Sequence, residues 1–332
     1  MQDHATYSNN IREGFDYLLA NYPEVFVMGQ GVWSPWYVGS TLSGLDKQYG
    51  TERIIDTPVS ESACTGAAIG AAISGMRPIV IHPRMDFMLY AADAIVNQAA
   101  KWRYMFGGQS QAPVTIRAII NRGGEQGAQH SQSLHSWFAH IPGIKVVAPY
   151  TAEDARDLLV MAVLSNDPVI YIDDRWLYDL EAVGPGHSLD KIDCFSLSKV
   201  RPQLLHEGTD CTIVSYGYGC RTSLDAAKQL FMKHGISCDV IDLRVVSPVQ
   251  PEPIVESVNK TGRLLVVDYA WSTCGVSSEI IALVVCHKDC NSLKSKPSRL
   301  TLPEAPAPSS TAMETVYYPS SNKISEAVMS ML

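Results

Sequence analysis

Short apolar runs alternate with longer helical stretches along the first half of the chain. The runs are rich in Val and Ile, and they lack the regular polar positions that mark a strand with one face in water. Runs of this kind are typical of a parallel sheet that helices cover on both faces. The expected strands are residues 25–29, 78–81, 113–120, 145–149 and 168–173, and the expected helices are residues 63–74, 90–105 and 152–164.

The alternation stops between residues 179 and 206 and then begins again. Within this stretch Gly184, Pro185 and Gly186 favour a linker. A second set of strands is expected at residues 211–217, 238–244 and 263–268, with helices at residues 223–233, 251–259 and 277–285.

The two blocks predict an α/β protein of two doubly wound domains. We place the first domain at residues 1–190 and the second, with the linker, at residues 191–332. The Pro-rich residues 302–319 are expected to be extended, and a short helix from Asn322 is expected to end the chain.

The composition limits which binding partners and which cellular compartment are expected for this protein. With 332 residues and 46% hydrophobic content, the chain can bury a full core. The net charge of −8 is spread along the chain without a Lys/Arg cluster, so we expect no nucleic-acid partner. No apolar run reaches the roughly 18 residues of a membrane span, and the N-terminal residues lack a secretory pattern, so a cytosolic location is expected.

Eight cysteines are spread over the chain without a CxxC pair. A dispersed set is typical of free thiols in a reducing compartment. Cys286, His287 and Cys290 lie close together on an expected helix and raise the alternative of a metal site. Two thiols without a second pair of ligands favour the interpretation as free thiols.

Glu61 lies between a short expected strand, Arg53–Asp56, and a helix of small residues. Its simplest role is to complement the positive end of the helix dipole, with Ser60 or Ser62 as the cap. The alternative is that the carboxylate at this strand-to-helix junction takes part in acid–base chemistry.

Residues 121–143 form a second candidate site. They follow the expected strand 113–120, so their glycines build a loop at the carboxyl edge of a parallel sheet, where such folds bind ligands. His130 lies among Gly, Gln and Ser and suits a general acid or base. His135 and His140 flank an apolar pair and are expected to pack or to cap a helix.

Several spaced segments carry a further pattern that extends over nearly the whole chain. They are RIIDTPVSE (53–61), GAAIGAAISGMRPIV (66–80), DAIVNQAAKWRYMFGG (93–108), GAQHSQS (127–133), IPGIKVVAPYTAEDARDLL (141–159), DPVIYID (167–173) and VIDLRVVSP (240–248). Together they resemble the β subunit of heterotetrameric 2-oxoacid dehydrogenase E1 components, in the transketolase-like superfamily that depends on thiamine diphosphate.

The resemblance implies a pyrimidine-binding-type domain followed by a transketolase C-terminal-type domain. It also implies roles for three residues. Glu61 matches the glutamate that hydrogen-bonds the pyrimidine ring of thiamine diphosphate, and Phe87 matches an aromatic residue that packs on this ring. His130 matches the histidine that stabilises or protonates intermediates and receives the acyl acceptor.

The chain contains no GDG turn, which enzymes of this kind need to hold Mg²⁺ and the diphosphate. The resemblance therefore implies a separate α subunit that supplies these groups, in an α2β2 assembly. It also implies a potassium ion on backbone carbonyls at Val114, Ala162, Ser165 and Asp167.

Three functions stay open on the sequence. The first is decarboxylation of a pyruvate-like 2-oxoacid with transfer of the acyl unit to the lipoyl group of an acyltransferase. The second is transfer to a carbonyl or sugar acceptor, because Trp33, Trp36, His82 and Arg84 stand where the resembling chains are more acidic or apolar. The third is a non-catalytic assembly subunit, against which the presence of both Glu61 and His130 counts.

Overall fold

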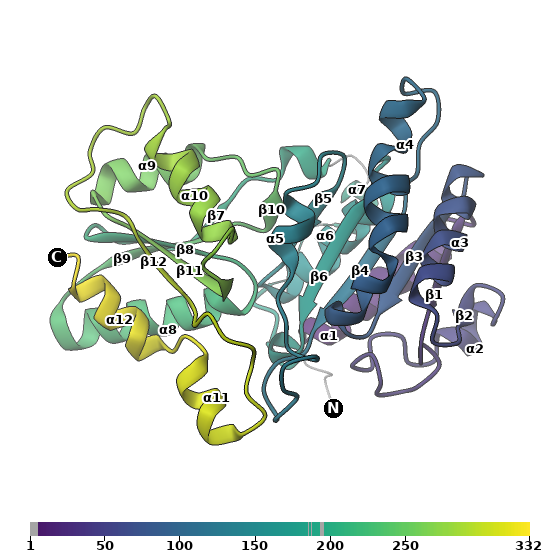
Figure 1. Cartoon of the computed structure of the whole chain (residues 1–332), viewed down its shortest axis with the longest axis horizontal. Helices are drawn as coiled ribbons and strands as arrows, with labels where there is room; N and C mark the ends of the chain where they lie inside the picture. The colour runs from purple at the N-terminus through teal and green to yellow at the C-terminus, as the bar shows by residue number, and fades with distance from the viewer. Residues whose placement is uncertain (1–5, 185, 187, 193–195) are drawn as a thin grey trace. The chain divides into compact units, whose positions relative to one another are not determined.

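The chain forms two compact units (Figure 1). The computed structural model describes residues 6–184, 186, 188–192 and 196–332. The first unit comprises Met1–Asn121 and Trp137–Lys199, and the second comprises Arg122–Ser136 and Val200–Leu332. A single division after residue 190 had been predicted, but the loop that carries His130 counts with the second unit.

The first unit is built on a parallel sheet in which its strands run in the order β5-β6-β4-β3-β1-β2. This arrangement confirms the α/β expectation. The strands are β1 (Val25–Gly29), β2 (Ile54–Asp56), β3 (Arg77–His82), β4 (Thr115–Ile120), β5 (Lys145–Val147) and β6 (Val169–Asp174). The α-helices up to the linker are α1 (Tyr7–Asn21), α2 (Leu45–Tyr49), α3 (Glu61–Ile73), α4 (Ala100–Met105), α5 (His135–Ala139), α6 (Ala152–Leu164) and α7 (Leu189–Ile192).

One predicted helix is divided into three kinds of turn. Residues 90–105 were expected to form a single helix, but the chain instead passes through a 3₁₀ helix η1 (Met85–Ala91), a π-helical segment η2 (Ala94–Ala99) and α4. Two further short 3₁₀ helices are η3 (Arg175–Leu177) and η4 (Leu197–Lys199). The predicted cap of α3 is also wrong, because Ser60 lies at the N-cap position without a side-chain hydrogen bond to the helix.

The second unit has a five-stranded sheet in the order β12-β11-β8-β9-β7. Its strands are β7 (Gln203–His206), β8 (Cys211–Ser215), β9 (Cys238–Asp242), β11 (Leu264–Trp271) and β12 (Ser298–Leu302), and the short β10 (Val245–Ser247) follows β9. Its helices are α8 (Tyr218–His234), α9 (Glu252–Thr261), α10 (Val276–Val285), α11 (Thr311–Tyr317) and α12 (Ser321–Met329).

Two predictions about this half of the chain are wrong. The expected linker ends earlier, because Gln203–His206 pairs antiparallel with β9 as an edge strand. The Pro-rich segment is not extended throughout, because Thr311–Tyr317 forms α11. This helix forms because Tyr317 and the following Tyr318 are buried in the core of the second unit, which a polar and Pro-rich composition does not reveal.

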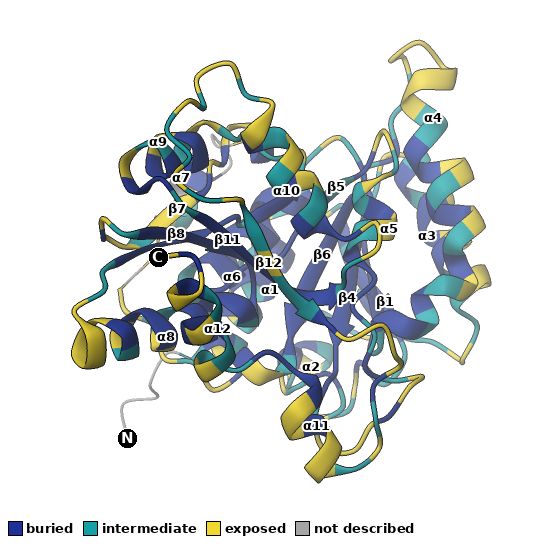
Figure 2. Ribbon diagram, turned by 60° about the vertical axis from the view of Figure 1, so that its left-hand side comes forward, coloured by how far each residue is buried: buried dark blue, intermediate teal, exposed yellow. Residues whose placement is uncertain are grey.

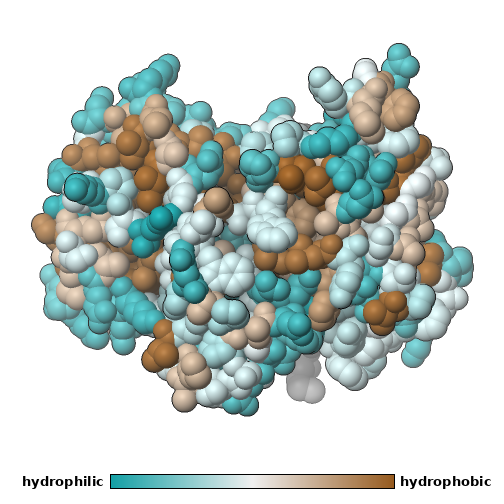
Figure 3. Space-filling view, viewed as in Figure 1, coloured by the Kyte–Doolittle hydropathy of each residue, from teal (hydrophilic) through white to brown (hydrophobic). Residues whose placement is uncertain are grey.

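Most strands are buried along their length, the edge strands β7 and β12 are partly exposed, and most helices expose their outward sides (Figure 2). The face shown in Figure 3 has hydrophobic residues among hydrophilic ones. Among the described residues, no helix combines the length and apolar character needed to cross a membrane.

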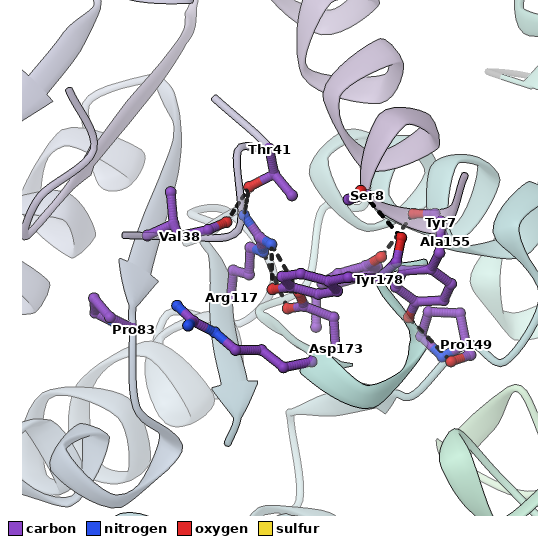
Figure 4. A network of polar contacts seen from close by, with 12 residues as sticks. Tyr7, Ser8, Val38, Thr41, Pro83, Arg117, Pro149, Ala155, Asp173 and Tyr178 are labelled. Atoms are coloured by element: carbon purple, nitrogen blue, oxygen red, sulfur yellow. Dashed lines mark hydrogen bonds and ion pairs between the residues drawn. The ribbon is translucent and has the colours of Figure 1, made fainter. Parts of the chain in front are cut away.

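A buried ion pair joins two strands of the first unit to the loop that follows β1 (Figure 4). Arg117 on β4 donates to both carboxylate oxygens of Asp173 on β6, at 3.0 and 2.7 Å, and neither side chain is exposed. Arg117 also donates to the Thr41 hydroxyl at 2.7 Å, and Tyr178 donates to Asp173 at 2.6 Å. Burial is the largest single influence on the pKa of Arg117 and lowers it, but the charge of Asp173, its hydrogen bond and the nearby Tyr178 and Tyr171 together raise the pKa, so the guanidinium stays charged.

Asp173→Asn is expected to lower the free energy of unfolding by about 3–5 kcal/mol, because it leaves the Arg117 charge buried without its counterion. Urea unfolding measures this loss. The matched control is Arg103→Met, which breaks the partly exposed pair between Arg103 and Asp167 and should cost about 1 kcal/mol or less. Equal losses in the two variants would contradict the assigned importance of the buried pair.

Candidate active site

Four polar side chains of the first unit meet at the carboxyl ends of β1 and β3. These strands pair in parallel, so their carboxyl ends lie at one edge of the sheet. Gln30 follows β1, and its amide donates to the Glu61 carboxylate at 3.1 Å. His82 ends β3, and its Nε2 lies 3.2 Å from the hydroxyl of Thr65 on α3. The strand-to-helix junction predicted for Glu61 is therefore part of a polar cluster.

His82 lies deep in this cluster, with 3% of its surface exposed. Burial lowers the pKa of His82 to about 4, although the charge of Glu61 acts in the opposite direction. The imidazole is therefore neutral at neutral pH. A neutral ring can either donate to or accept from the Thr65 hydroxyl, and it places no second charge beside Glu61.

Glu61 lies in the first turn of α3 and is half-buried. It therefore does complement the helix dipole, as the simpler interpretation held. Gln30 donates to one of its oxygens at 3.1 Å, and the other oxygen has no hydrogen-bond partner among the described residues, so it can meet a ligand. A carboxylate with a free oxygen at the ligand-binding edge of a sheet fits the pyrimidine nitrogen of thiamine diphosphate. Phe87, on η1 beyond the end of β3, is also half-buried.

His130 lies in the loop Arg122–Ser136, which the second unit holds at both main-chain and side-chain positions. The Glu125 amide donates to the Glu314 carboxylate at 3.1 Å, and the Thr311 amide donates to the Glu125 carboxylate at 3.1 Å. The His130 amide donates to the Gly127 carbonyl at 3.3 Å. The loop is therefore anchored by α11, and His130 is half-buried within it.

Near the end of this loop, His135 belongs to a buried polar triad with Tyr216 and Asp268 of the second unit. The Tyr216 hydroxyl donates to Asp268 at 2.5 Å, and the Nε2 of His135 lies 3.5 Å from the same carboxylate oxygen. Because the hydroxyl proton is used there, His135 donates to the Tyr216 oxygen. Burial raises the pKa of Asp268, but hydrogen bonds and the charge of His135 outweigh it and lower the pKa below its usual value.

This triad was missed by sequence reasoning, which expected His135 to pack or cap. His135 does begin α5, and only 1% of its surface is exposed. Its partners are distant in sequence: Tyr216 follows β8, and Asp268 lies within the buried run of β11. No local pattern therefore connects the three residues. His140, in contrast, is exposed.

The four residues of the expected potassium site lie around the end of α6 and the starts of β4 and β6. The Val114 carbonyl accepts from Val169 at 3.0 Å, and the Ser165 carbonyl accepts from Arg77 at 3.0 Å. A carbonyl oxygen has a second lone pair, so these bonds do not exclude a cation. The potassium site stays a prediction.

The expected helix around Cys286 is wrong in one respect, because α10 ends at Val285. Within the described ranges, no group of three or more His, Cys, Asp or Glu side chains could hold a metal ion. The cysteines described there are free thiols, and Cys194 lies outside the described residues.

Residues 3–179 match the transketolase pyrimidine binding domain, and residues 201–324 match the transketolase C-terminal domain. The chain is 40% identical over 327 residues to the acetoin:2,6-dichlorophenolindophenol oxidoreductase subunit beta of Cupriavidus necator, covering 96% of this chain and 94% of the relative. It is 37% identical over 307 residues to the pyruvate dehydrogenase E1 component subunit beta of Rickettsia felis, covering 92% and 91%. The chain belongs to the E1 β-like family of transketolase-type subunits.

Solved structures agree on the fold of this E1 β-like chain. A split gene transketolase, described as an inactive beta4 tetramer, matches with a TM-score of 0.74 at 22% identity, covering 98% of this chain and 96% of that one. The two units of the E1 β-like chain therefore correspond to the two expected domain types. Glu61 lies in the first unit and His130 in the second.

Stability of this E1 β-like chain is expected to fall between pH about 6.5 and pH about 4 through His82. In this pH range the imidazole of His82 is protonated in the unfolded chain but not in the folded one. The free energy of unfolding therefore falls by about 3 kcal/mol as the pH is lowered over that range. His82→Gln should remove this part of the pH dependence in urea unfolding, and His140→Gln, at an exposed position, should keep it. The same pH dependence in both variants would contradict the assignment.

Proposed function

We propose that the chain is the β subunit of a two-component thiamine-diphosphate enzyme that decarboxylates a pyruvate-like 2-oxoacid and transfers the acyl unit to a lipoyl group. The observation that carries the proposal is the Glu61 carboxylate, which Gln30 holds at the carboxyl edge of a pyrimidine-binding-type unit. The relative named as a pyruvate dehydrogenase subunit supports a 2-oxoacid as the donor.

Residues of two chains would together bind the cofactor. Glu61 would hold the pyrimidine nitrogen and Phe87 would pack on the ring, whereas the missing GDG turn assigns the diphosphate and Mg²⁺ to an α subunit. An α2β2 assembly would complete the site, and a potassium ion would brace the end of α6 at the four carbonyls described above. Bound thiamine diphosphate supplies the carbanion chemistry.

The chain's own groups have three tasks. Glu61 would hydrogen-bond the ring nitrogen of bound thiamine diphosphate and could exchange a proton with it, and the amide of Gln30 positions the carboxylate for this role. The neutral His82 adds no competing charge beside that carboxylate. His130, on a loop anchored by α11, supplies a proton to the reacting group and orders the acceptor.

A second candidate is transfer of the aldehyde unit to a carbonyl or sugar acceptor. The loop after β1 favours it, since Trp33 is 47% exposed and Trp36 is 71% exposed beside a chain segment without acidic residues. Exposed indoles can stack on a sugar ring, which a lipoyl arm does not need. The third candidate is a non-catalytic role as an assembly subunit. Unchanged proton exchange and an unchanged complete reaction in both variants below would indicate this role.

Glu61→Gln in the complex reconstituted with the α subunit is expected to slow exchange of the thiazolium proton by about 10²–10⁴, because the amide cannot exchange a proton with the ring. Cofactor affinity should change by less than about tenfold, because the glutamine side chain can still form a hydrogen bond with the ring nitrogen. Proton exchange is followed by NMR after quenching, and calorimetry gives the affinity. An unchanged exchange rate would leave Glu61 with its helix-dipole role alone.

His130→Ala is expected to leave thiazolium proton exchange nearly intact and to lower the complete reaction by about 10²–10⁴, as for a positioned acid or base. The control is His140→Ala, which changes an exposed histidine beyond the loop. Equal losses in exchange and in the complete reaction would show that His130 supports cofactor geometry instead.

A further inference from the structure

Three neighbouring strands of the first unit are each followed by a side chain rich in hydrogen-bond donors. Arg84 follows β3, Asn121 follows β4 and Arg175 follows β6, and the order of these strands in the sheet is β6-β4-β3. All three strands are parallel, so the donors lie at the same carboxyl edge as the Glu61 cluster.

The strand ends place these residues near one another. Ile120 on β4 is the partner of Asp174 on β6, and Asn121 and Arg175 follow directly on these paired ends. On the other side, β3 ends at His82, the partner of Ala118, and Arg84 follows two residues later, where the chain bends into η1. The three donors therefore gather within the width of three strands.

The two guanidinium groups are near enough to repel each other. Burial lowers the pKa of Arg84, and the charge of Arg175 lowers it further, whereas Tyr37, Asp86 and Tyr178 raise it. Asp86 is thus the carboxylate that partly offsets the pair. Asp173 is engaged by Arg117 and by the Tyr178 hydroxyl, and Asp174, which ends β6, accepts from the Trp176 amide at 3.0 Å.

Two donor atoms of these side chains are buried. Over the described part of the chain, Asn121 Nδ2 and Arg175 Nε have no hydrogen-bond partner, and only 7% of the Asn121 surface is exposed. A buried donor without an acceptor is costly, and such groups in native proteins call for an explanation. An acceptor from outside the chain would satisfy both.

We propose that Arg84, Asn121 and Arg175 form a binding site for the oxyanion group of a small-molecule substrate, either a carboxylate or a phosphate. Guanidinium forks bind planar carboxylates and phosphates through paired, charge-assisted hydrogen bonds, and the amide adds a neutral donor beside them. A lipoyl amide carries no charge and would gain little from two cations. The site therefore favours an acidic donor or acceptor.

The substrate assignment rests on the proposed function, whereas the anion site does not. Arg84 is two residues beyond His82, and His82 contacts Thr65 on the helix that Glu61 begins. A substrate whose anionic group is bound by Arg84 would therefore lie at the same edge of the sheet as the proposed cofactor ring. The site would act as a specificity determinant for the reaction that Glu61 initiates.

A purely structural role for Arg175 is the main alternative. Its Nη2 donates to the Tyr37 carbonyl and so helps to hold the loop after β1. One such bond uses a single nitrogen and leaves Nε without a partner, so loop anchoring does not account for the whole guanidinium. Loop anchoring by Arg175 also does not explain why a second arginine, Arg84, lies beside it, with Nη1 donating to the carbonyl of the adjacent Pro83 at 3.0 Å.

The test measures binding of inorganic phosphate and of malonate, separately, to the full chain reconstituted with its α subunit, by isothermal titration calorimetry. Arg84→Met and Arg175→Met should each weaken binding of the preferred anion by at least about tenfold, because each removes a charge-assisted donor. Arg175→Lys keeps the charge and should recover part of the loss. The control Arg221→Met removes a partly exposed arginine of α8 and should bind as the wild type does.

The outcomes separate the proposal from its alternatives. Tighter binding of phosphate or of malonate identifies the oxyanion and supports the site. No heat of binding with either probe overturns the proposal, and so does binding that neither arginine variant weakens. If Arg175→Met lowers the melting temperature, Arg84→Met still decides the point. Anion binding needs no turnover, so failure of the thiamine function would leave this result intact, and the reverse also holds.

Discussion

A buried ion pair between Arg117 and Asp173 is the interaction on which the first unit depends. It lies between neighbouring strands β4 and β6, where water cannot reach either group, and the Thr41 hydroxyl brings the loop after β1 to the same guanidinium. Such a pair stabilises little over an apolar alternative, but it fixes geometry because a missing partner is so costly. The carboxyl edge of the sheet is thereby held in one arrangement.

Negative and positive side chains lie at different positions along that edge. Near β1 and β3 a single carboxylate, Glu61, stands beside the neutral His82 and the amide of Gln30. Further along, beyond β3 and β6, Arg84 and Arg175 bring positive charge. One part of the edge suits a ring with a basic nitrogen, and the other suits an anion. Both follow from parallel strands ending side by side.

The second unit supports function by anchoring a loop. The segment Arg122–Ser136 follows β4, yet Glu125 bonds to Glu314 of α11, and His135 bonds to Tyr216 of the second unit in the triad with Asp268. The low pKa of Asp268 and the protonated Tyr216 keep this triad hydrogen-bonded at neutral pH. His130 therefore lies on a loop that hydrogen bonds hold to α11, as the acid–base role proposed for it requires.

The sequence by itself determined the α/β class, the strands β1 and β6 nearly to the residue, the helix α6, and the candidates Glu61 and His130. These follow from local properties, namely apolar periodicity, glycine-rich junctions and spaced motifs. Tertiary structure alone decided that residues 90–105 break into three kinds of helix and that the Pro-rich tail folds as α11 over a buried Tyr317. It also brought together Arg84, Asn121 and Arg175, and His135 with Asp268. These groupings depend on which strands are neighbours and on what burial does to a charge, and neither is written in adjacent residues.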